Sequence, residues 1–147
     1  MKKRPLITLL CLLLALAPAI SRADGDKPKK EDTELEKSMD VMAKSWRKLR
    51  KQAADPAQNA DSLTLLGTIM TAADKNLTLT PDLARDVPAE KRDAFVAGYK
   101  EKMKELVAAF GELQTALKAN DNKAAAALVD KIGGLQKAGH KEYKRPD

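Results

Sequence analysis

The sequence predicts an all-α protein, an up-down-up-down antiparallel four-helix bundle. Beyond about residue 32, apolar residues recur every three or four positions, as on one face of a helix, and strand-like alternation is absent. Prolines and a cluster of asparagine and aspartate divide this pattern into four segments. Short connections join the first segment to the second and the third to the fourth, which favours antiparallel neighbours. About 120 residues follow the predicted leader, a length typical of one domain.

The start of the chain is predicted to be an export signal rather than part of the fold. Three basic residues are followed by an apolar stretch over residues 6–16, and Ala23 ends a segment suited to cleavage. The apolar stretch is too short to span a bilayer comfortably, and no second one follows. We therefore expect a signal peptide over residues 1–23, a flexible tail over 24–32 and the bundle over 33–144. The mature protein is expected in the periplasm, without a membrane anchor.

Cysteine content and charge limit the functions open to the mature chain. Cys11 is the single cysteine, and it lies inside the predicted signal without the small preceding residues of a lipid-attachment site. A mature chain without cysteine has no disulfide, thiolate metal site or cysteine nucleophile. Removing the four basic residues of the signal from the 27 in the sequence leaves 23 against 21 acidic residues, a net charge of +2. Because opposite charges are interspersed and aromatic residues are few, nucleic acid is not an expected partner.

The first helix is predicted to begin near Asp32 or Thr33, and Thr33 can form a capping box with Glu36. Apolar residues in steps of four and three then mark its inner face: Leu35, Met39, Met42, Trp46 and Leu49. Asp55 and Pro56 are expected to end this helix and to start the second, with Asp55 as N-cap and Pro56 at the first position.

The second helix is expected to lead into the one long connection of the bundle. Its predicted inner face consists of Leu63, Leu66, Met70 and Ala73. The polar stretch over residues 76–87 contains Pro81, which a helix interior does not accommodate. We therefore expect this stretch to connect the second helix to the third.

The third and fourth helices are predicted from their stripes of apolar residues. Asp86 and Pro88 restart the helical pattern, and the cluster Asn120-Asp121-Asn122 interrupts it. Between these points the stripe consists of Phe95, Tyr99, Leu106, Phe110, Leu113 and Leu117. The last helix is expected to run from about Asn122 or Lys123 to Tyr143. It turns Leu128, Ile132, Leu135 and Gly139 inward, with His140 at the margin of that face.

The end of the last helix carries the most informative pattern in the chain. His140 is the only histidine, and a fixed order of residues surrounds it: Gly133, Lys137, His140, Tyr143 and Arg145. This order resembles the haem-attachment segment of cytochrome c′, with Gln136 and Gly139 where that segment has its two cysteines. A bundle with this histidine and no cysteines resembles the cytochrome b562 family, four-helix bundles that hold haem without covalent bonds.

The resemblance implies a b-type cytochrome that binds one non-covalent haem b and transfers single electrons. It also implies a methionine ligand on the first helix, after a Leu-Glu pair, which here is Leu35-Glu36 followed by Met39. In an up-down-up-down bundle the start of the first helix and the end of the last lie at one level. Met39 lies about 9 Å along the first helix, so it can face His140. Methionine and histidine form a known axial pair for haem iron.

Three further residues are expected to contact the haem: Gln136, Tyr143 and Lys144. The family carries an arginine one turn before its histidine, where this chain has Gln136, so Lys144 or Arg145 is the expected substitute for contact with a haem propionate. Three glycines of the last helix each cost about 1 kcal/mol relative to alanine inside a helix. We therefore expect a group to approach closely at Gly133, Gly134 and Gly139, either the haem or a neighbouring helix.

Several alternatives remain open at this point. Met42, one turn beyond Met39 on the same face, is the second candidate ligand, and Met70 and Met103 are more simply core residues. If no methionine coordinates, five-coordinate iron would bind small gases. A haem-free bundle that binds a partner protein or acts like a chaperone is the alternative from another class.

An enzyme is not expected, because the chain offers no second histidine and no glycine-rich phosphate loop. The expected partners are haem and an unidentified redox protein, and a monomer is expected.

Overall fold

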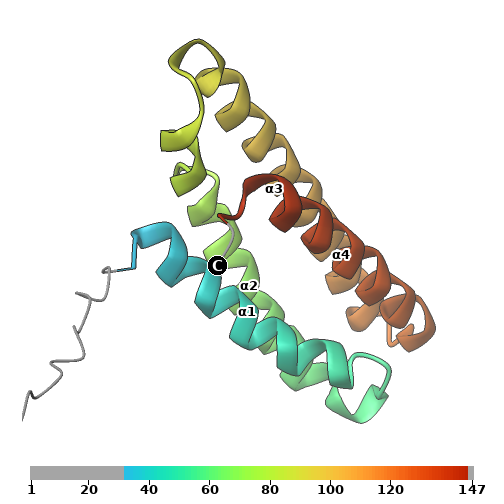
Figure 1. The fold of residues 1–147 in the computed structure, drawn as a ribbon. Helices are drawn as coiled ribbons and strands as arrows, with labels where there is room; N and C mark the ends of the chain where they lie inside the picture. The colour runs from blue at the N-terminus through green and yellow to red at the C-terminus, as the bar shows by residue number, and fades with distance from the viewer. Residues whose placement is uncertain (1–31, 146–147) are drawn as a thin grey trace, which may run out of the picture. The chain divides into compact units, whose positions relative to one another are not determined.

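The computed structural model describes residues 32–145, and in these residues it contains four α-helices and no strand (Figure 1). The helices are α1 (Glu34–Gln52), α2 (Asn59–Asn76), α3 (Ala89–Lys118) and α4 (Asn122–Tyr143). Two short 3-10 helices lie in the connections, η1 (Pro56–Gln58) and η2 (Asp82–Asp86). The predicted all-α four-helix bundle is therefore confirmed. The predicted signal peptide and nearly all of the predicted tail lie outside the described residues.

Helix α1 begins with the predicted capping box. The Thr33 hydroxyl accepts a hydrogen bond from the backbone N–H of Glu36 at 3.2 Å, and the Glu36 carboxylate accepts one from the N–H of Thr33 at 2.7 Å. Two backbone donors that the helix itself cannot satisfy thus gain partners. On the inner face Met42, Trp46 and Leu49 are buried. The register of α1 was therefore predicted correctly.

The start of α2 differs from the prediction. Asp55 is a cap, but of η1 rather than of α2: its carboxylate accepts from the N–H of Ala57 at 3.0 Å, and α2 begins only at Asn59. The physical reason is the buried Asn59 side chain, which exchanges hydrogen bonds with Asn122 of α4 at 2.8 and 3.2 Å. The 3-10 turn places Asn59 where its side chain can form these hydrogen bonds with Asn122. The predicted inner face also omitted Ile69, which is fully buried.

The connection between α2 and α3 spans residues 77–88, one residue later than predicted, and it contains a 3-10 helix that the sequence did not indicate. Asn76, which we assigned to the connection, is the last residue of α2, and its side chain is fully buried. Helix η2 occupies part of the remainder, and α3 begins directly after Pro88. Asp86 does not cap α3 and instead forms an ion pair with Arg145 beyond the end of α4.

The turn between α3 and α4 lies where the sequence predicts it. Asn120 adopts a left-handed conformation with φ of 56°, which asparagine tolerates better than most residues. Asp121 then caps α4 by accepting a hydrogen bond from the N–H of Ala124 at 2.9 Å. The predicted bounds of the fourth helix are confirmed.

The core lies between the helices and consists mainly of apolar side chains. Trp46 of α1 packs edge-on against Phe110 of α3, with ring centroids 5.8 Å apart. The largest fully buried apolar side chains come from all four helices: Leu49, Leu66, Ile69, Leu113, Leu117 and Ile132. Across the described residues, no helix combines the length and apolar character needed to cross a membrane.

The helices do not pack equally closely with one another. Close backbone contacts join α1 to α2, α3 to α4 and α2 to α3, whereas α1 and α4 are not closely packed along their backbones. We expected the last helix to run antiparallel beside the first. They are separated because side chains of α1 and α4 line a cavity between them.

Candidate functional site

The cavity between α1 and α4 has a volume of about 490 Å³ and is lined mainly by apolar side chains. Its apolar wall comes from all four helices: Met39, Met42 and Trp46 of α1, Ile69 of α2, Tyr99, Met103, Leu106 and Phe110 of α3, and Ile132 and Leu135 of α4. Leu83 of η2 also contributes, although the sequence indicated only a connection in that segment. A cavity of this volume with a mainly apolar lining is typical of a site for an organic ligand or cofactor.

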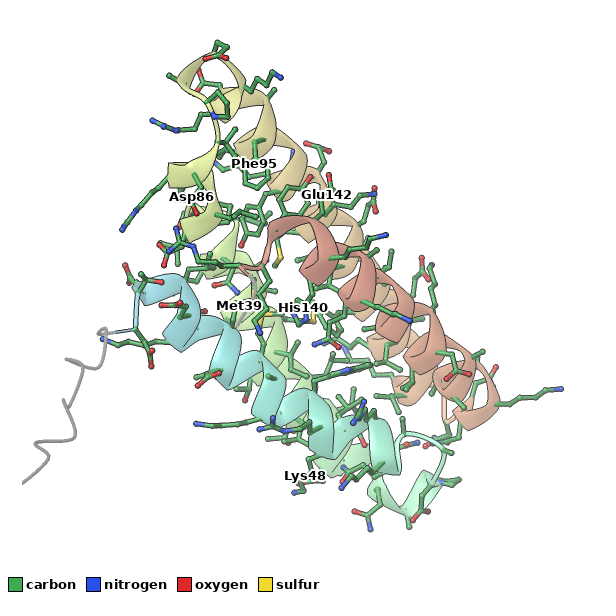
Figure 2. All side chains as sticks on the ribbon, viewed as in Figure 1. Met39, Lys48, Asp86, Phe95, His140 and Glu142 are labelled. Atoms are coloured by element: carbon green, nitrogen blue, oxygen red, sulfur yellow. The ribbon has the colours of Figure 1, made fainter. Side chains whose placement is uncertain are left out.

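Met39 and His140 lie on opposite sides of this cavity. Met39 is in the second turn of α1, and His140 is three residues before the end of α4. Both line the cavity, and Figure 2 shows their side chains pointing toward one another from the two helices. The antiparallel topology thus brings together two residues that are about 100 positions apart in the chain.

The surroundings of His140 favour its neutral form. Partial burial lowers the pKa of His140 below its ordinary value, and repulsion from the Lys144 ammonium lowers the pKa further. The residue nevertheless keeps an exposed surface toward solvent. A neutral imidazole has a free nitrogen lone pair and is the form that binds a metal.

The donor set does not suit a bare metal ion. Among residues 32–145, no group of three or more histidine, cysteine, aspartate or glutamate side chains is placed to hold one. Met39 and His140 offer one soft sulfur and one imidazole nitrogen, the two protein ligands that haem iron takes in some cytochromes. The donor chemistry therefore fits a metal whose remaining ligands come from a macrocycle.

The two methionines of α1 share a hydrogen-bond donor that was not predicted from the sequence. The side-chain N–H₂ of Asn76 lies 3.1 Å from the Met42 sulfur and 3.5 Å from the Met39 sulfur. Met42 is the more deeply buried of the two methionines, with 7% of its surface exposed. The only sequence signal for Asn76 was a polar residue in phase with the buried face of α2.

The other expected contact residues also line the cavity. Gln136, Tyr143 and Lys144 lie along its α4 side, together with Arg145. The Tyr143 ring packs against Phe95 and Tyr99, with centroids 5.0 and 5.7 Å away. Burial, followed by the hydrogen bond to Glu142, raises the pKa of Tyr143 to about 12, so this phenol stays protonated at neutral pH.

The glycines of α4 are not explained by helix packing. At Gly133, Gly134 and Gly139, a Cβ atom would meet no described protein atom within 4 Å. The expected close approach by a neighbouring helix is therefore wrong. Gly139 lines the cavity one residue before His140, so its missing side chain leaves the surface beside the imidazole flat and open. This open surface fits a planar ligand.

Comparison with known proteins gives one match. A family model described as cytochrome b562 matches residues 34–144, from the first residue of α1 to one residue beyond α4. The match includes both sides of the cavity and all the predicted site residues. Searches of curated proteins and of solved structures gave no match.

Proposed function

Because the chain belongs to the cytochrome b562 family, we propose that it binds one haem b in the cavity between α1 and α4 and transfers single electrons. The family consists of haem-binding cytochromes of electron transfer. In this proposal His140 and Met39 are the axial ligands, and no covalent bond holds the haem. The observation that carries the proposal is that these two side chains face each other across an apolar cavity of about 490 Å³.

The residues of the cavity have distinct roles in this proposal. Haem supplies a one-electron iron couple when it is bound. His140 presents a neutral nitrogen, since burial and Lys144 disfavour its protonation. Trp46 and Phe110 belong to an apolar wall that excludes water, and such a wall strengthens electrostatic interactions with the bound group. A soft thioether ligand such as that of Met39 raises the reduction potential of haem iron.

The charged edge of the haem is proposed to lie on the α4 side of the cavity. Gln136, Lys144 and Arg145 line that side, and their amide, ammonium and guanidinium groups can donate hydrogen bonds to propionate carboxylates. Arg145 is already paired with Asp86, which fixes its position. Lys144 or Arg145 is the proposed substitute for the arginine that the family carries at the position of Gln136.

We also propose that the protein works in the periplasm after removal of residues 1–23. This part of the proposal rests on the basic, apolar and small-residue segments of the sequence. Its test is the N-terminal sequence of the protein purified after expression with its leader intact. A mature chain that begins near Asp24 supports export, and an intact leader contradicts it.

The haem proposal is tested by titrating the haem-free protein with haem and following the visible absorption spectrum. We expect saturation at one haem per chain and, after reduction, the spectrum of six-coordinate low-spin iron. Acid-acetone should extract all the pigment, because the mature chain has no cysteine to form a thioether bond. His140→Ala is the matched control and should bind haem weakly or not at all. A wild-type protein that takes up no haem would instead support the haem-free bundle.

One observation favours a second candidate, a gas-binding protein with five-coordinate iron. Both methionine sulfurs of α1 lie within hydrogen-bond distance of Asn76, so a thioether can be held by the protein rather than by iron. In that case ferrous wild-type protein would bind carbon monoxide readily. Six-coordinate wild-type protein that binds carbon monoxide poorly rules out this candidate.

A further inference from the structure

Asn76 is a buried polar residue without an evident role in stability. None of its surface is exposed, and among the described residues its side-chain oxygen has no hydrogen-bond partner. A buried amide oxygen without a partner is destabilising, and an apolar side chain of similar shape would avoid that cost. The placement of Asn76 therefore calls for an explanation other than packing.

The surroundings of Asn76 connect it to both candidate ligands. Its amide nitrogen donates toward Met42 at 3.1 Å and toward Met39 at 3.5 Å. The backbone carbonyl of Asn76 in turn accepts a hydrogen bond from the Tyr99 hydroxyl at 3.3 Å, which anchors the end of α2 beside α3. Asn76 does not itself line the cavity, so it acts on a bound group only through the methionines.

The two contacts are not equivalent. The Met42 sulfur is the closer acceptor, and its side chain is buried at 7% exposure, whereas Met39 is only partly buried. If Met42 turned toward a metal, the Asn76 nitrogen would lose its nearer acceptor while its oxygen already lacks a donor. Met39 can turn into the cavity at a smaller cost because its contact with Asn76 is longer.

We propose that Asn76 is a positioning residue that selects the axial ligand: its amide holds the Met42 thioether in the protein interior and leaves Met39 for the haem iron. This inference rests on the proposed haem function and adds a determinant of ligand choice. Met42 lies about 4.5 Å further along the axis of α1 than Met39, so both sulfurs compete for the same region of the cavity. Without the Asn76 amide, the preference for Met39 is lost.

The test compares Met39→Ala in the wild-type background and in the Asn76→Leu background. In the wild-type background, Met39→Ala should give five-coordinate ferrous iron that binds carbon monoxide tightly. In the Asn76→Leu background, Met42 becomes available, so Met39→Ala should keep the thioether–iron charge-transfer band in its ferric form. The carbon monoxide affinity of this double variant should be lower than that of Met39→Ala alone by on the order of tenfold, because only a fraction of its molecules has an open coordination site. Asn76→Ala serves as a second variant if leucine does not fit.

Asn122→Leu is the matched control, since Asn122 is another buried asparagine but bonds to Asn59 and to the Ala53 carbonyl. It should lower the melting temperature without changing the ligand. If Met39→Ala behaves identically in the wild-type and Asn76→Leu backgrounds, the selection role is overturned, while the haem proposal stands.

A second readout needs no haem. In haem-free protein labelled at the methionine methyl groups, Asn76→Leu should shift the Met42 methyl resonance more than that of Met39, because the Met42 contact is shorter. An unshifted Met42 methyl resonance would contradict the contact between the Asn76 amide and the Met42 sulfur. Failure of the wild-type protein to bind haem would overturn the proposed function, and ligand selection with it, even if this methyl shift were observed.

Discussion

A Cβ atom on Gly98 of α3 would lie only 2.6 Å from the hydroxyl oxygen of Tyr143 at the end of α4. Gly98 is inside a long helix, where glycine is less favourable than alanine by about 1 kcal/mol. The missing side chain makes room for the Tyr143 ring, which packs against Phe95 and Tyr99 and lines the cavity. Gly98 therefore belongs to the site although it does not line the cavity itself.

Gly98→Ala should accordingly have different effects on stability in two backgrounds. With Tyr143 present, the new methyl group displaces the ring and cancels the gain in helix propensity, so the protein is no more stable than wild type. In a Tyr143→Phe background the nearest remaining ring atom, Cζ, lies at an ordinary 3.7 Å. There Gly98→Ala should stabilise by about 1 kcal/mol. Urea unfolding of the four proteins gives the coupling energy, and additive effects would contradict the contact.

The asparagine pair at the other end of the bundle should contribute to stability. Asn122 donates to the Ala53 carbonyl and to Asn59, both at 2.8 Å, and Asn59 donates back at 3.2 Å. Asn122→Leu leaves buried polar groups unpaired and should lower the free energy of unfolding by about 1–3 kcal/mol. Asn76→Leu, which removes an unpaired oxygen, should lower it far less. Equal losses in urea unfolding would contradict this distinction.

Alkaline pH should destabilise the haem-free protein through Tyr99. Burial raises the pKa of Tyr99 to about 12 from its ordinary value of 10. The folded state therefore holds this proton more tightly than the unfolded state. The resulting stability is fully present below pH 10 and is lost as the pH rises toward 12. Urea unfolding between these values should show a smaller loss for Tyr99→Phe than for wild type, and identical losses would argue against this origin.

Haem should raise the thermal stability of the bundle strongly. The cavity exists only when α1 and α4 are folded, so a ligand bound there stabilises the native state alone. At a thousandfold excess over Kd the gain is about 4 kcal/mol, which corresponds to a shift in melting temperature on the order of 10–20 °C. Differential scanning calorimetry with and without haem measures it, and His140→Ala is the control. Equal melting temperatures would favour the haem-free alternative.

The local features of the fold were predictable because local chemistry determines them. The Thr33 capping box, the Asp121 cap and the apolar stripes depend on residues a few positions apart. The position of Met39 opposite His140 was also predictable, because in an antiparallel bundle the start of the first helix lies at the same level as the end of the last. The 3-10 turn before Asn59 was not, since it depends on a partner in α4, 63 positions away.

The burial of Asn76 is a second feature that could not be predicted from the sequence. A polar residue five positions before a proline looked like the start of a loop, yet its side chain is buried against two methionines from α1. The separation of α1 from α4 was likewise not predictable, because apolar stripes indicate which faces turn inward but not how closely two faces meet. Side-chain contacts between distant segments decide both features.

The central claim, that Met39 and His140 are the axial ligands, is tested most directly by carbon monoxide titration of the ferrous protein in four forms. The account predicts weak binding by wild type and by Met42→Ala, tight binding by Met39→Ala, and little or no haem in His140→Ala. Met39→Ala should also have a lower reduction potential, because it loses the thioether. Unchanged carbon monoxide affinity and potential in Met39→Ala, or full haem binding by His140→Ala, would contradict the claim.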